Sequence, residues 1–197
     1  MAKFSYNKSN RENARQASSF EPLPKGAYVC KILRADEQKN ANNDGSHVRI
    51  GFDIAEGEYK DFYKKQFDAN TNEDRKWPND AMYLLSVPND DSKEWQVQQW
   101  DTFWTHVEDS NEGYVFDGES SKLKGKLFGG LFHNEQSEYE GKIYDHTKLK
   151  WTRPAQDIRD NKYGKLPKDK LIDSSKVKDD SDFMSIPEGE GDEIPFD

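Results

Sequence analysis

The sequence has only one cysteine, Cys30, and four histidines among its 197 residues. One cysteine cannot form a disulfide within the chain, so we expect a reducing compartment, the cytoplasm. The histidines show no metal-ligand spacing and one thiol cannot complete a zinc cluster, so we expect no metal site. Cys30 itself lies in an apolar run that is typical of a core strand rather than of a nucleophile.

The motifs of common enzyme classes are also missing. Neither a GxxxxGK[ST] phosphate loop nor a GxSxG nucleophile elbow occurs in the sequence. Carboxylates are abundant, which leaves a nuclease-type pair open, but their spacing singles out no candidate. We therefore expect a binding protein that is not an enzyme and needs no cofactor.

Long hydrophobic runs are absent. Hydrophobic residues make up 32% of the chain, and the mean hydropathy is -1.15. No stretch approaches the roughly 20 apolar residues of a membrane-spanning helix, and the N-terminus lacks the apolar core of a signal peptide. These absences predict a soluble protein without a membrane partner. Aromatic residues reach 13%, which favours a small core plus some exposed rings over disorder throughout the chain.

The negative charge is concentrated at one end of the sequence. The net charge is -9, and residues 179–197 contain eight acidic and no basic side chains. The rest of the chain has 29 basic and 30 acidic side chains and is nearly neutral. A uniformly acidic protein is a poor candidate for binding nucleic acid, but this distribution permits a basic face on a neutral body.

The pattern of apolar residues predicts three strands, a helix and two further strands. The strands are expected at residues 26–36, 47–55, 58–67, 124–133 and 146–153. Apolar residues at helical spacing predict a helix over residues 92–110, capped by Asp91 or Ser92. Residues 37–46, 68–90 and 134–145 are expected to form loops, and Pro154 is expected to open a short helical turn.

This order of elements predicts a mainly β protein with a five-stranded OB-fold-like barrel, whose one helix lies between strands three and four. Split sheets and other small barrels have the same order and stay open as alternatives. The barrel is expected over residues 25–167. A flexible arm is expected at residues 1–24, and a disordered acidic tail with a docking tip at residues 168–197.

The C-terminal sequence DEIPFD combines acidic residues with an apolar tip that folding does not require. Proline limits the entropy lost on docking, phenylalanine fits a pocket, and the acids suit a basic rim. The candidate partner-binding residues are Asp192, Glu193, Ile194, Pro195 and Phe196. The tip is similar to that of bacterial single-stranded DNA-binding proteins, which recruits replication, recombination and repair enzymes. Here Asp197 follows the phenylalanine, whereas that family ends on it.

Segments of the body resemble small proteins from phages and prophages of Gram-positive bacteria, a group that includes single-stranded DNA-binding proteins. The likeness covers roughly residues 26–167 and is one of pattern and order. The segments are DIAEGEYKDFYKKQF, EDSNEGYVFD, LKGKLFGG, EYEGKIYDHTKLKW and RPAQDIRDNKYGKLP. The resemblance implies an OB-type domain that acts in phage DNA replication or recombination.

A protein that binds single strands needs flat rings for the bases and cations for the phosphates. OB-folds use the face of strands two and three and the loops after strands one and four. Rings interleaved with Lys and Arg occur in these parts of the sequence. The candidate DNA-binding residues are Arg49, Tyr59, Phe62, Tyr63, Lys64, Lys65, Phe67, Arg75, Lys76, Trp77, Tyr139, Tyr144, Lys150, Trp151 and Arg153. Trp77 lies in a polar segment and is the best candidate for an exposed ring.

The expected function is to bind single-stranded DNA without strong sequence preference and to recruit replication or recombination enzymes through the tip. Self-association into a homo-oligomer is a further possible partnership. Two alternatives stay open. One is a recombination mediator that anneals strands, and the other is a DNA-mimic or adaptor protein that binds a host enzyme instead of DNA.

Overall fold

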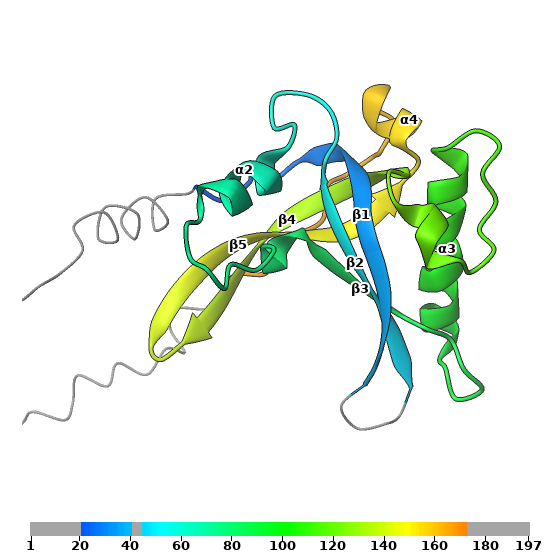
Figure 1. The fold of residues 1–197 in the computed structure, drawn as a ribbon, viewed down its shortest axis with the longest axis horizontal. Coiled ribbons are helices and arrows are strands. Elements are labelled where there is room, and N and C mark those ends of the chain that lie inside the picture. Colours follow the sequence, from blue (N-terminus) through cyan, green and yellow to red (C-terminus); the bar gives the residue numbers. More distant parts are fainter. Residues whose placement is uncertain (1–20, 41–44, 173–197) are drawn as a thin grey trace, which may run out of the picture.

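An antiparallel sheet of five strands organises the computed structural model, which describes residues 21–40 and 45–172 (Figure 1). Its strand order is β3-β2-β1-β4-β5. The strands are β1 (Ala27–Lys39), β2 (Ser46–Ile54), β3 (Met82–Ser86), β4 (Leu127–Tyr139) and β5 (Lys142–Arg153). Within the described residues no ladder joins β3 to β5, so the sheet is not closed into a barrel.

Short helices and one long helix lie between the strands and after the last of them. They are α2 (Phe62–Ala69), the 3-10 turn η1 (Asn79–Ala81), α3 (Glu94–Asp109), the 3-10 turn η2 (Ser120–Leu123) and α4 (Ala155–Arg159). The long helix between β3 and β4 and the short helix after Pro154 confirm the predictions. The predicted cap at Asp91 or Ser92 is wrong, because the backbone N–H of Lys93 donates to Gln96 Oε1 at 2.9 Å as α3 begins.

The core lies between the sheet and α3. The predicted alternation along β2 places Ile50, Phe52 and Ile54 in this core, where all three are fully buried. The Phe52 ring contacts Phe128 and Phe132 of β4 edge-on, with ring centroids 5.8 and 5.9 Å apart. Helix α3 adds three apolar side chains on one face, Phe103, Trp104 and Val107. Burial of these rings contributes strongly to the stability of the fold.

The third strand is not where the sequence predicts it. Residues 58–67 form a turn followed by α2, and the third strand is β3, within a stretch that the sequence assigns to loop. The aromatic residues Tyr59, Phe62 and Tyr63 have the i, i+3, i+4 spacing of a helix, which the prediction overlooked. In β3, Tyr83 and Leu85 are buried and alternate with Met82 and Leu84, the period of a half-buried strand.

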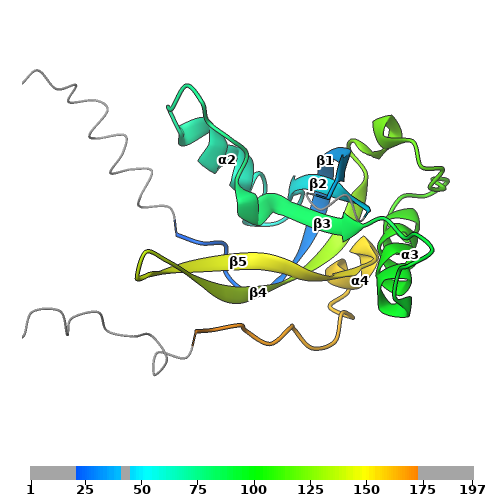
Figure 2. The same cartoon turned by 90° about the horizontal axis from the view of Figure 1, so that it is seen from below.

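The predicted loop at residues 134–145 is instead a β-hairpin. Strands β4 and β5 pair through Tyr139 and Lys142, and Glu140 and Gly141 turn the chain with positive φ angles of 50° and 72°. Two such residues form the tight turn that matches the twist of paired strands. The hairpin projects from the end of the molecule opposite α3 (Figures 1 and 2).

The chain beyond the predicted domain boundary runs along β4. Gln136 N–H donates to Lys170 C=O and Lys170 N–H donates to Asn134 C=O, both at 2.9 Å. The ammonium groups of Lys25 and Lys170 form salt bridges with Asp169 and Glu135 at 2.8 and 2.9 Å. The structure therefore describes a fixed segment up to Ile172. The predicted docking tip, residues 192–196, lies outside the described residues, as does most of the predicted N-terminal arm.

Candidate nucleic-acid interface

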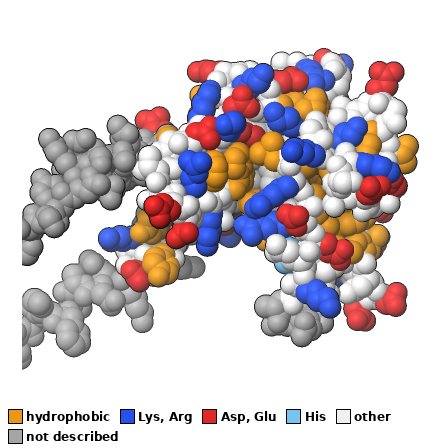
Figure 3. Space-filling model, viewed as in Figure 1, with side chains coloured by type: hydrophobic (Ala, Val, Ile, Leu, Met, Phe, Trp, Pro, Cys, Tyr) orange, Lys and Arg blue, Asp and Glu red, His pale blue; other side chains and the backbone are white. Residues whose placement is uncertain are grey.

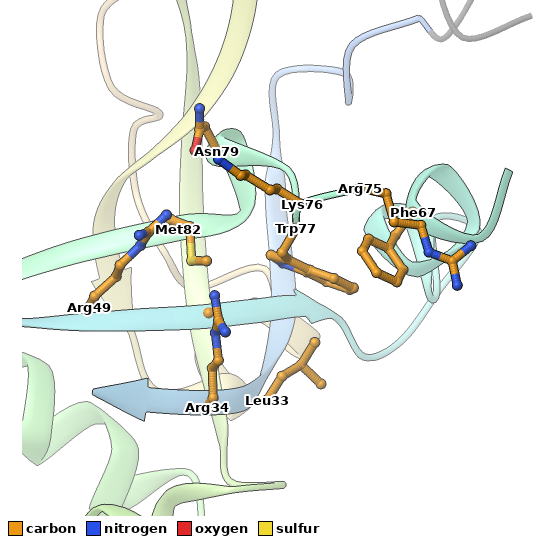
Figure 4. Close-up of a pocket in the computed structure, with 10 residues that line it drawn as sticks. Leu33, Arg34, Arg49, Phe67, Arg75, Lys76, Trp77, Asn79 and Met82 are labelled. Atoms are coloured by element: carbon orange, nitrogen blue, oxygen red, sulfur yellow. The ribbon is translucent and has the colours of Figure 1, made fainter. Parts of the chain in front are cut away.

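A basic cleft of about 450 Å³ lies on the outer face of β1, β2 and β3 (Figure 4). This volume is within the roughly 300–1,000 Å³ range of sites that take small organic ligands. Four cationic side chains line it: Arg34 from β1, Arg49 from β2, and Arg75 and Lys76 from the segment between α2 and η1. Figure 3 shows Lys and Arg side chains around hydrophobic atoms near the middle of this face.

A β-bulge in β1 shapes the floor of the cleft. Ile32 pairs with Phe52 and Arg34 pairs with Gly51, so Leu33 is an extra residue without a partner in the ladder. Because of the extra residue, Leu33 and Arg34 both line the cleft although they are neighbours in sequence.

Gly51 leaves space in the floor of the cleft. A Cβ atom added there would lie 3.2 Å from Arg34 Cγ and 3.4 Å from Met82 Sδ. A larger side chain would therefore fill the hollow that a ligand needs.

Two aromatic rings form the wall of the cleft near α2. The centroids of Phe67 and Trp77 are 5.6 Å apart, and the guanidinium of Arg75 lies 4.6 Å from the Phe67 ring centroid. Trp77 is partly buried rather than the exposed ring that the sequence predicts, because it packs against the core and its indole Nε1–H donates to the backbone carbonyl of Phe52 at 3.3 Å. Rings fixed next to cations are the arrangement that stacks bases beside neutralised phosphates.

The cations of the cleft are available to a ligand. Within residues 21–40 and 45–172 no carboxylate forms a salt bridge with Arg49, Arg75 or Lys76. Arg34 has only a long contact with Asp36, in which Nε and Oδ2 are 3.9 Å apart and both side chains are more than half exposed. Such a surface pair is weak, so a phosphate can replace it at little cost.

Helix α2, which carries Phe67, is held by a buried carboxylate of β2. Asp53 is 1% exposed and accepts N–H groups from Ile54 at 2.8 Å and from Tyr63 and Lys64 at 3.0 Å. Tyr63 and Lys64 are in the first turn of α2, where backbone N–H groups have no partner inside the helix. Burial raises the pKa of the Asp53 carboxyl, and the three N–H groups partly oppose this effect.

The cleft brings together five of the candidate DNA-binding residues from separate parts of the chain. These are Arg49, Phe67, Arg75, Lys76 and Trp77. It also contains residues that sequence reasoning missed, namely Leu33, Arg34 and Met82. Regular alternation does not predict the exposure of Arg34, because a bulge shifts it. Met82 is in β3, where the sequence predicts a loop.

Other candidates on the predicted third strand lie away from the cleft. Tyr59 and Phe62 are partly buried against the core, and Tyr63 is 2% exposed. Lys64 pairs with Asp68 on the surface of α2, and Lys65 is exposed beside it. A strand at residues 58–67 would place the alternate residues Tyr63, Lys65 and Phe67 on one face, but these residues are on helix α2 and that face does not form.

We predict that Tyr63→Phe stabilises the protein. The Tyr63 hydroxyl is buried and has no hydrogen-bond partner within the described residues, so removing it removes a desolvated polar group. We expect the free energy of unfolding in urea to rise by about 1 kcal/mol. A loss of stability would contradict this account.

The remaining candidates belong to two other surfaces. Lys150, Trp151 and Arg153 line a second hollow, between β5 and α3. Tyr139 and Tyr144 are on the projecting hairpin and are 66% and 44% exposed. The fifteen candidates therefore do not form one site.

Three further observations concern the described residues only. They contain no group of three or more His, Cys, Asp or Glu side chains placed to hold a metal ion. None of their helices combines the length and the apolar character needed to cross a bilayer. Cys30 is fully buried, and burial raises the pKa of its thiol well above the usual value, as is typical of an unreactive cysteine.

In comparisons with known proteins, no family model matches this sequence, and no curated protein matches it either.

Proposed function

We propose that the protein binds single-stranded DNA in the cleft between β1, β2, β3 and α2. The observation that carries the proposal is that four cations and two rings share one concave face, while three of these cations form no salt bridge with a carboxylate in residues 21–40 and 45–172. Each stacked base contributes about 1–3 kcal/mol, and each neutralised phosphate makes the affinity depend on salt. Neither contribution depends strongly on the base sequence, so the protein is expected to bind strands of many different sequences.

The connectivity of the sheet supports an OB-type architecture. An OB-fold is a five-stranded, partly open barrel that binds oligonucleotides across its second and third strands. The order β3-β2-β1-β4-β5, with α3 between β3 and β4, suits such a barrel opened between β3 and β5. The basic cleft lies over β2 and β3, where this architecture places its ligand.

The alternative of a DNA mimic is less well supported. A DNA mimic needs an acidic surface with its aromatic residues buried, whereas none of the residues that line the cleft is acidic. A strand-annealing activity would use the same cleft, and an annealing assay with complementary oligonucleotides separates it from simple binding. A role in phage replication, recruitment of enzymes by residues 192–196 and self-association stay predictions of the sequence.

Tryptophan fluorescence during titration with a thymidine oligonucleotide tests the proposal. We expect strong quenching that weakens as salt rises, because rings stack on bases beside phosphate-binding cations. Trp77→Phe should remove a large part of the quenching and preserve most of the affinity, because phenylalanine still offers a ring. Trp100→Phe is the matched control, because Trp100 packs in the α3 cluster. A flat titration of the wild type at low salt would overturn the proposal.

A further inference from the structure

A second hollow, of about 600 Å³, lies between α3 and β5 and has the same chemistry as the cleft. Two indole rings line it, Trp95 of α3 and Trp151 of β5, and they are 59% and 45% exposed. Lys150 and Arg153 line it as well, and none of its lining residues is acidic. In the described part of the chain Lys150 and Arg153 form no salt bridge. Two exposed tryptophans that share a groove with such cations are more than the scattered apolar residues of an ordinary surface.

A second β-bulge presents these residues to the groove. In the β4–β5 ladder, Leu131 pairs with Trp151 and Phe132 pairs with Leu149, so Lys150 is the extra residue. As a result Lys150 and Trp151 are both exposed, while their neighbours Leu149 and Thr152 are buried. The bulge in β1 does the same for Leu33 and Arg34 in the basic cleft. Bulges are frequent where a strand has to redirect side chains toward a ligand.

Strand β3 separates the two hollows and connects them at its edge. Met82 lines the basic cleft, and the next residue, Tyr83, lines the second hollow. Leu84 lies on the same face as Met82, opposite Arg49 in the ladder, and is 57% exposed. No strand pairs with the outer edge of β3 within the described residues. A flexible chain can therefore leave the cleft over Leu84, pass round this edge and enter the second hollow.

We propose that the hollow between α3 and β5 is a second subsite for the same single strand, which wraps round the edge of β3. The inference rests on the proposed function of the basic cleft. It assigns base stacking to Trp95 and Trp151 and phosphate binding to Lys150 and Arg153. It also explains why these cations and rings are presented on a surface that the first cleft does not include.

The experiment compares oligonucleotides of two lengths, five and twenty thymidines, on the full chain. A Trp95→Ala/Trp151→Ala variant should bind the short oligonucleotide as the wild type does, since the basic cleft is intact. It should bind the long one at least about tenfold more weakly, because one or two stacked bases are lost. The number of nucleotides covered per protein, from stoichiometric titration, should also fall. Tyr139→Ala/Tyr144→Ala is the control, because it removes two exposed rings outside both hollows.

The outcomes separate this inference from the function on which it rests. If the wild type binds neither oligonucleotide, the proposed function fails. If the wild type binds them but the tryptophan variant matches it on twenty thymidines, the second subsite fails alone, and a protein partner becomes the occupant to test. An equal loss on both lengths, or a loss confined to the tyrosine control, also overturns it. Lys150→Gln/Arg153→Gln provides a second measurement, and it should reduce the salt dependence for the long oligonucleotide only.

Discussion

A variant in which Arg34, Arg49 and Lys76 are replaced by glutamine is expected to bind single-stranded DNA on the order of 100-fold more weakly at about 0.1 M salt. Each phosphate contact contributes about 0.7 to the slope of log affinity against log salt for a single strand, so three lost contacts lower it by roughly 2. Fluorescence titration at four or more salt concentrations measures both quantities. Glutamine keeps most of the length of these side chains, so the change isolates charge.

A charge-matched control makes this result specific to the cleft. Lys124, Lys142 and Lys165 are exposed and line neither hollow, so their replacement by glutamine changes the net charge equally. We expect this control to retain nearly all of the wild-type slope of log affinity against log salt. If the two variants lose the same amount of DNA affinity, attraction between DNA and the charge of the whole protein explains the binding. The cleft then has no special part in it.

The parts of the fold that the sequence predicts correctly are those in which apolar residues recur at a regular period. Alternation along residues 47–55 identifies β2, and helical spacing locates α3 between the third and fourth strands. The order of strands and helix follows from these patterns. The closed barrel does not follow, because closure depends on whether β3 and β5 pair, and no local pattern reports a contact between strands so far apart in the chain.

The cleft is predicted only in part, for a related physical reason. Rings and cations between Phe67 and Trp77 are visible in the sequence because they are close together. Arg34 and Lys150 owe their exposure to bulges, and a bulge breaks the alternation from which exposure is predicted. The prediction of a strand at residues 58–67 overlooked the helical spacing of the aromatic residues there. It also lacked a contact that no local pattern reports, in which the Asp53 carboxylate of β2 accepts the N–H groups of the first turn of α2.

Asp53 is unusual because it caps a helix to which it does not belong. Asp61 occupies the N-cap position of α2, adopts a left-handed φ of 58° and makes no side-chain cap bond. The Asp53 carboxylate accepts the N–H groups of Tyr63 and Lys64 instead, and so ties α2 to β2. Because α2 carries Phe67 into the cleft, this one buried side chain links the sheet that holds Arg49 to the wall that holds the ring.

We predict that Asp53→Asn lowers the free energy of unfolding by about 3 kcal/mol, which corresponds to a fall in Tm of roughly 6–12 °C. The asparagine oxygen can still accept from Ile54 and Tyr63, but its amide group then faces the Lys64 N–H, and two donors oppose each other in a buried site. Thermal and urea unfolding measure the loss. The DNA affinity of the folded fraction should also fall, because α2 no longer holds Phe67 in place.

Asp61→Asn is the matched control for this prediction, because it makes the same substitution at the nominal cap. Asparagine tolerates the left-handed backbone, and the Asp61 carboxylate makes no cap bond that could be lost. Its stability is therefore expected to stay within about 0.5 kcal/mol of the wild type. If Asp61→Asn were the more damaging variant, α2 would be capped locally. The connection between β2 and the cleft wall would then have to come from the packing of Tyr63 on Phe52, whose ring centroids are 5.9 Å apart.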